Sequence, residues 1–73
     1  DILVYENQFK PILLIECKSP DVPVGPHVMQ QIAQYNSVIG ARYLLLSNGM
    51  EHFIVEVNPS TGSLTFLDDL PLI

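Results

Sequence analysis

Two charged residues close an otherwise apolar segment in the first quarter of the chain. Glu16 and Lys18 follow the apolar residues 12–15 and are separated by one residue. Side chains two apart in a β-strand point to the same face, so a carboxylate and an ammonium group are expected side by side. Charges at the end of a buried run are costly unless they are paired or bound to metal. A strand-end salt bridge and a metal-dependent catalytic pair are the two interpretations of this spacing.

Asp1 supplies a second carboxylate if the first strand returns as a hairpin. Residues 2–5 are strand formers, residues 6–10 are a polar connection, and Pro11 opens the next strand. In an antiparallel pair the start of one strand lies near the end of the other, with opposed Cβ atoms about 4.5–5.5 Å apart. We therefore predict that Asp1 and Glu16 share one divalent cation. A solvated chain end is the alternative for Asp1.

The donor set fits Mg²⁺, which prefers oxygen ligands and is typically held by one or two carboxylates plus substrate phosphate. Asp1 and Glu16 supply carboxylates, and the backbone carbonyl of Cys17 is a third candidate oxygen. Lys18 is placed to orient an attacking water or to neutralise charge on the phosphorus. The Cys17 side chain itself is expected to be a small buried hydrophobe rather than a catalytic thiol. The set predicts metal-assisted phosphodiester hydrolysis, with Mn²⁺ as a substitute ion.

The elements that must position these residues are predicted in the order β-β-α-β-β-β. A helix between the second and third strands implies a parallel, right-handed crossover. The pattern is that of a mixed α/β sheet with the helix on one face, and the opposite face is expected to need cover from further sequence. The strands are expected at residues 2–5, 12–18, 42–47, 52–57 and 63–67.

The helix is expected between two residues that favour helix ends. Pro26 closes a proline-rich loop of residues 19–26 and suits the first turn of the helix, and Gly40 suits its C-terminal end. Helical spacing predicts one apolar stripe toward the sheet. The stripe consists of Val28, Ile32, Tyr35 and Ile39.

Composition limits the size and the partners of the chain. Its 73 residues make at most one small domain, and the abrupt start suggests that residues 1–73 are part of a larger protein. The net charge of −5, with three Lys and Arg residues, argues against nucleic-acid binding by this piece alone but not against a cation site. The sequence shows no membrane span and no secretory leader. The single cysteine fits a reducing, cytoplasmic environment.

The order of these motifs resembles the PD-(D/E)xK nuclease superfamily. Its pattern is an acid, a spacer of roughly 10 to 20 residues and then Asp/Glu-x-Lys, which Asp1 and Glu16-Cys17-Lys18 match. The surrounding residues, including Pro11 to Pro20, are similar to the N-terminal nuclease domain of type I restriction enzyme R (HsdR) subunits. On the predicted helix, Gln31-x-x-x-Tyr35 matches the Gln-x-x-x-Tyr motif of HsdR-like and RecB-like nucleases.

The resemblance implies roles for individual residues. Asp1 and Glu16 would be metal ligands, and Lys18 would be the catalytic lysine. Gln31 would contact the site or the DNA backbone, and Tyr35 would contact DNA or brace Gln31. The alternative for these two helix residues is an ordinary pair one turn apart, with Tyr35 in the core.

The same resemblance implies a restriction-endonuclease-like core whose N-terminal helix is missing from the chain. The activity would be Mg²⁺-dependent DNA endonuclease cleavage, and the isolated fragment could be inactive. Partners would be DNA and the other domains or subunits of a restriction-modification complex, with a homo-oligomer as a further option. ATP would be used only by a motor domain of the parent protein, because no phosphate-binding glycine loop occurs in this sequence.

Two other functions remain open at this level. The same fold could serve as a catalytically inactive interaction or assembly module, which the high apolar content and low positive charge favour. An intact set of Asp, Glu, Lys and Gln disfavours that reading. A small ligand-binding or sensor module unrelated to nucleases is the second alternative, and Lys18 pointing into solvent away from the acids would favour it.

Overall fold

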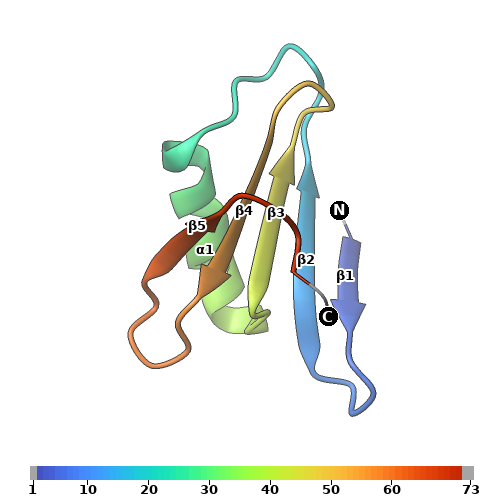
Figure 1. Cartoon of the computed structure of the whole chain (residues 1–73), viewed down its shortest axis with the longest axis vertical. Coiled ribbons are helices and arrows are strands. Elements are labelled where there is room, and N and C mark those ends of the chain that lie inside the picture. The colour runs from blue at the N-terminus through green and yellow to red at the C-terminus, as the bar shows by residue number, and fades with distance from the viewer. Residues whose placement is uncertain (1, 72–73) are drawn as a thin grey trace.

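The chain folds into a five-stranded mixed sheet with one helix packed on one face (Figure 1). The computed structural model describes residues 2–71. The predicted order β-β-α-β-β-β is confirmed. The elements are β1 (Ile2–Tyr5), β2 (Pro11–Cys17), α1 (Pro26–Ile39), β3 (Tyr43–Ser47), β4 (His52–Val57) and β5 (Leu64–Leu67).

The strands lie in the sheet in the same order as in the chain. β1 and β2 form the expected antiparallel hairpin, in which Ile2 pairs with Ile15. β2 and β3 are parallel, because α1 returns the chain to the end of the sheet where β2 began, and Glu16 pairs with Leu46. β3, β4 and β5 continue as antiparallel neighbours. Within residues 2–71, no helix has the length and apolar character that crossing a membrane requires.

The core lies where β2 and β3 meet α1. Leu14, Leu44 and Leu46 are buried on the helix side of the sheet. Leu13, the residue before Leu14, points to the opposite face of the sheet and is buried there as well. β2 is therefore apolar on both faces, as suits a strand that lies between two others in the sheet. Burial falls off toward its C-terminal end, where Glu16 is half-buried and Cys17 is exposed.

Both ends of α1 follow the predicted signals. The helix begins at Pro26, and Gly40 ends it with φ 81°, in the left-handed region. Asn36, in the last turn, is buried, and its Nδ2 donates to the Ala41 carbonyl (2.9 Å) while its Oδ1 accepts from the Ala41 backbone N–H (3.0 Å). These two hydrogen bonds attach the end of the helix to the residue pair that leads into β3.

The predicted apolar stripe of α1 is wrong at one position. Tyr35 was expected in the core, but 64% of its surface is exposed. The buried positions are Met29, Ile32 and Asn36, so the row that faces the sheet is displaced by about one residue from the one expected. Asn36 can occupy the core because Ala41 satisfies its amide. Tyr35 consequently lies on the rim of the helix.

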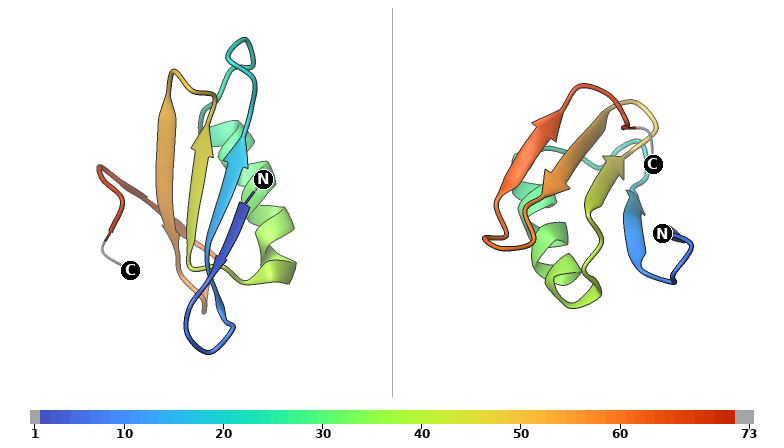
Figure 2. Two further views of the ribbon diagram at one scale, coloured as in Figure 1. Left: turned by 90° about the vertical axis from the view of Figure 1, so that its right-hand side faces the viewer. Right: turned by 60° about the horizontal axis from the view of Figure 1, so that its bottom comes forward.

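The sheet face opposite α1 is partly covered by the chain itself. After β5, residues 68–71 cross this face, as the two views of Figure 2 and the red segment of Figure 1 show. Leu13 and Tyr43 are buried on this face. Some of the cover that we expected from further sequence is therefore supplied by the chain's own C-terminal segment.

We predict that Gly40→Ala destabilises the fold by about 1–2 kcal/mol, because an L-residue with a Cβ is strained at φ 81°. Urea unfolding followed by far-UV circular dichroism measures the change. Gly25→Ala is the matched control, since φ is 171° there and an added Cβ meets nothing within 4 Å. Equal losses in the two variants would contradict the role of Gly40 as a left-handed helix end.

Candidate active site

The central feature of the candidate site is an ion pair at the end of β2. Lys18 Nζ lies 3.2 Å from Glu16 Oε2. The Glu16 side chain is 16% exposed and the Lys18 side chain 35% exposed, so both are partly withdrawn from water. The prediction that the two side chains share one face is thereby confirmed. They share it with Leu14, which packs in the core beneath α1.

The backbone around this pair is fixed by both neighbouring strands. Glu16 is in register with Leu46 of β3, and the Lys18 backbone N–H donates to the Ser47 carbonyl (2.7 Å). On the other side, the pairing of β1 with β2 reaches Ile15, opposite Ile2. Asp1, the other predicted metal ligand, lies outside the described residues. The described part of the site is therefore built from the ends of β2 and β3.

Tyr35 reaches the same region from the helix. An open hollow of about 420 Å³ lies between α1 and the first hairpin, and Glu16 and Tyr35 both line it. Its remaining lining residues are apolar, namely Ile2, Leu3, Leu14 and Ile39. Gln31 is exposed one helical turn before Tyr35 and does not line this hollow. The structure thus brings Glu16 and Tyr35 to one hollow, whereas neither Lys18 nor Gln31 is among the residues that line it.

Cys17 differs from the expectation for its side chain. It was expected to be buried, but it is exposed. It occupies the last position of β2 and alternates with Glu16, so its side chain lies on the face opposite α1. Because the Lys18 N–H points to β3, the alternation of a strand directs the Cys17 carbonyl to the β1 side. The carbonyl is therefore on the side of the sheet where the chain begins.

The described residues alone do not provide a complete metal site. Among residues 2–71, no group of three or more His, Cys, Asp or Glu side chains could hold a metal ion. Glu16 offers one carboxylate that already accepts an ammonium partner, which suits a hard cation with oxygen ligands. A site with two carboxylates requires Asp1 in addition.

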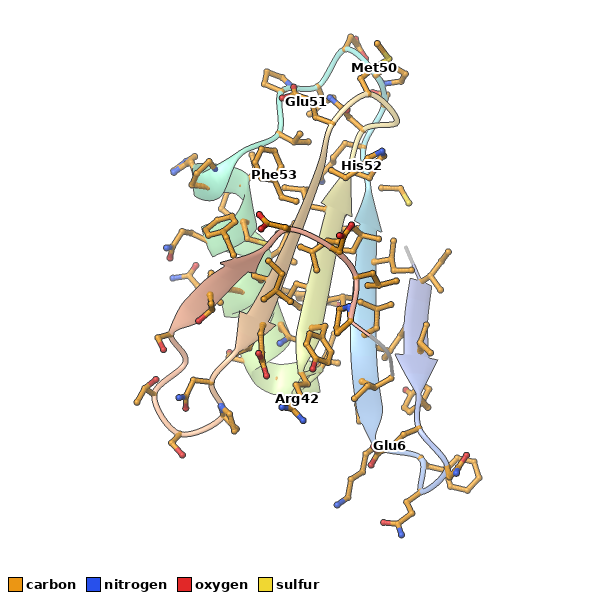
Figure 3. The ribbon with its side chains drawn as sticks, in the orientation of Figure 1. Glu6, Arg42, Met50, Glu51, His52 and Phe53 are labelled. Carbon is orange, nitrogen blue, oxygen red and sulfur yellow. The ribbon has the colours of Figure 1, made fainter. Side chains whose placement is uncertain are left out.

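The other ion pair of residues 2–71 lies at the far end of the sheet. Arg42 Nε and Nη2 donate to Glu56 Oε2 at 3.1 and 2.9 Å, and this hydrogen-bonded contact raises the pKa of Arg42. Figure 3 shows Arg42 at the opposite end from His52, whose strand position pairs with Ser47. Arg42 is therefore paired with Glu56 at the far end of the sheet, and Lys18 is the cation beside Glu16 at the end of β2.

Asn48 lies in the turn between β3 and β4 and was not among the residues that the sequence indicated for the site. Its side chain is buried, with 5% of the residue exposed. Nδ2 donates to the Val22 carbonyl (2.9 Å), and Oδ1 accepts from the backbone N–H groups of Met50 (2.9 Å) and Glu51 (2.8 Å). Gly49, the residue after Asn48, has φ 88°, in the left-handed region that a tight turn uses. The contact with Val22, 26 residues earlier, has no signature in the sequence.

Comparison with known proteins agrees with the resemblance in the motifs. The family described as "Type I restriction enzyme R protein N terminus (HSDR_N)" matches residues 1–71. No curated protein matches the chain, and no solved structure matches it. The match covers the strands, the helix and both charged residues of the ion pair. By this match, the chain belongs to the family of type I restriction enzyme R protein N termini.

Proposed function

We propose that the chain carries the Mg²⁺-dependent DNA endonuclease site of a type I restriction enzyme R-like protein. Membership of the family supports a restriction-enzyme, nuclease-like domain. The observation that carries the finer assignment is the Glu16–Lys18 pair, held 3.2 Å apart at the end of a central strand and beside an open hollow. A carboxylate and an ammonium group so placed are the groups that metal-assisted phosphodiester hydrolysis needs.

Asp1 completes the ligand set in this proposal. Glu16 alone gives one anionic ligand, so the proposal requires the carboxylate of Asp1 as the second. The Cys17 carbonyl, on the β1 side of β2, is the third oxygen. Two carboxylates against one ammonium leave the site net negative, which favours a divalent cation. Mn²⁺ substitutes for Mg²⁺ because both accept oxygen ligands.

In this proposal Lys18 is the catalytic residue and Glu16 is a metal ligand. In the described structure Lys18 neutralises Glu16 directly. When bound, the metal ion lowers the pKa of a coordinated water and polarises the scissile phosphate. Glu16 would hold the ion, and the ammonium group of Lys18 would act on the phosphate or on the attacking water.

DNA would approach over the rim of α1. Tyr35 is exposed beside the hollow, and Gln31 is exposed one turn earlier, so a DNA backbone lying there could contact both. The net charge of −5 means that most phosphate contacts must come from other domains or subunits of a restriction-modification complex. A motor domain of the parent protein, rather than this chain, would use ATP.

A catalytically inactive assembly module is the second candidate function. The large exposed apolar side chains of Ile2, Tyr35 and Val38 favour it, because such surface suits a protein partner. The contact between Lys18 and Glu16 weighs against it, since an assembly module has no need of a half-buried pair beside a hollow. The same contact removes the condition that favoured an unrelated sensor module, because Lys18 does not point away from Glu16.

We expect Glu16→Gln and Lys18→Ala each to lower single-turnover DNA cleavage by about 100-fold or more, because each removes a group that acts on the transition state. The measurement uses the intact protein with Mg²⁺ and excess enzyme. Glu56→Gln is the matched control, because it breaks the exposed ion pair at the other end of the sheet. Undiminished cleavage in both site variants would end the nuclease assignment.

Mn²⁺ binding should distinguish the role of Glu16 as a metal ligand from the role of Lys18. We expect Glu16→Gln to weaken Mn²⁺ binding by about 10-fold, because it removes an anionic ligand. Lys18→Ala should bind Mn²⁺ at least as tightly as the unmodified protein, since the competing ammonium group is gone. Titration followed by electron paramagnetic resonance measures both. Weakened binding in Lys18→Ala alone would contradict these roles.

Gln31→Ala should lower cleavage by about 10-fold without changing stability by more than about 0.5 kcal/mol, because Gln31 is exposed. Gln30→Ala is the control, since Gln30 is also exposed on α1 but projects about 100° away around the helix. Cleavage assays and urea unfolding give the two quantities. The same loss of cleavage in both variants would show that Gln31 has no special role.

A further inference from the structure

Ser47, the last residue of β3, and Asn48, which follows it, form hydrogen bonds with the two ends of the segment 18–22. At the first end, the Lys18 N–H donates to the Ser47 carbonyl (2.7 Å). At the other end, Asn48 Nδ2 donates to the Val22 carbonyl (2.9 Å). Between them, the Val22 N–H donates to the Ser19 carbonyl (2.9 Å), which closes a turn. Residues 18–22 therefore form a short turn, and its two ends are hydrogen-bonded to β3 and to the turn that follows β3.

The orientation of the Asn48 amide is determined by its partners. Oδ1 accepts from the N–H groups of Met50 and Glu51, so this atom must be the oxygen. Nδ2 is then the atom that faces Val22, and it can only donate. Because Asn48 is buried, water cannot readily replace any of these bonds. Asn48 thus joins the β3–β4 turn to the loop after β2 in a single geometry.

Lys18 depends on this loop more than Glu16 does. Glu16 lies within β2 and is paired with Leu46. Lys18 lies beyond the last residue of β2, Cys17, and continues directly into this turn. The position of its ammonium group beside Glu16 therefore relies on the loop, while the carboxylate relies on the sheet.

We propose that Asn48 is a positioning residue, which fixes residues 18–22 through the Val22 carbonyl and so holds Lys18 beside Glu16. The effect of Asn48 on DNA cleavage rests on the proposed nuclease function. Its effect on the position of Lys18 does not.

Asn48→Asp is the most direct test. The aspartate keeps an oxygen for the Met50 and Glu51 N–H groups but places a second oxygen, which cannot donate, against the Val22 carbonyl. Asn48→Ser is the second variant, because it loses the reach to Val22 without adding a charge. The matched control is Asn36→Asp, since Asn36 is equally a buried asparagine that donates to one backbone carbonyl and accepts from backbone, but at the other end of the sheet.

Three measurements on the intact protein distinguish positioning from general stability. Single-turnover cleavage at saturating DNA and Mg²⁺ reports Lys18, and Mn²⁺ binding reports Glu16. Amine labelling read by peptide mass spectrometry compares Lys18 with the exposed Lys10. We expect Asn48→Asp and Asn48→Ser to lower cleavage by about 10- to 100-fold, because small displacements of a catalytic group cost this much. Mn²⁺ affinity should change less than about twofold, and labelling of Lys18 relative to Lys10 should rise severalfold.

The control decides the interpretation. Folded Asn36→Asp should keep its cleavage rate and its Lys18 labelling. If Asn36→Asp and the Asn48 variants lose cleavage in proportion to their unfolding free energies, with unchanged Lys18 labelling, the proposal is overturned. If Glu16→Gln and Lys18→Ala leave cleavage intact, the proposed nuclease function is wrong. The labelling of Lys18 is then the test of the positioning role of Asn48. Raised Lys18 labelling in its variants then supports the positioning role, and unchanged labelling overturns it.

Discussion

The burial of β2 between β1 and β3 is the constraint on which the rest of the structure depends. Leu13 and Leu14 are both buried, on opposite faces, so the strand cannot slip by one residue without exchanging its two sets of side chains. Fixed register assigns Glu16 and Lys18 to the helix side of the sheet. It also places Glu16 at the half-buried C-terminal end of the strand, beside an open hollow.

The helix adds a second constraint, which acts through its C-terminal end. Asn36 and Gly40 fix that end against Ala41 at the entry to β3, and this sets the rotation of α1 about its axis. With that rotation, Met29 enters the core and Tyr35 turns outward to line the hollow beside the sheet. The side of the helix opposite the core therefore carries the exposed side chains, Tyr35 among them.

The two ion pairs found among residues 2–71 lie at opposite ends of the sheet. Arg42 is held by Glu56 at one end, and Lys18 is held by Glu16 at the other. The first pair is exposed and of the kind that contributes little to stability. The second is partly withdrawn from water, and Glu16 lies beside a hollow. The two paired cations therefore differ in their surroundings, because the Lys18 side chain is less exposed than the Arg42 side chain.

The sequence by itself determined the order of the elements, their approximate ends and the shared face of Glu16 and Lys18. These follow from backbone periodicity and from proline and glycine, which act over a few residues. Only the tertiary structure decided that Tyr35 is exposed, that Cys17 is exposed on the helix-free face, and that Asn48 reaches the loop after β2. Each of these depends on how two elements distant in sequence pack together. A helix can present either of two adjacent rows of side chains with similar local energy, and a turn asparagine finds its partner only when the loops meet. The physical reason is that local patterns fix which face of an element is apolar, whereas contacts between elements fix its rotation and its neighbours.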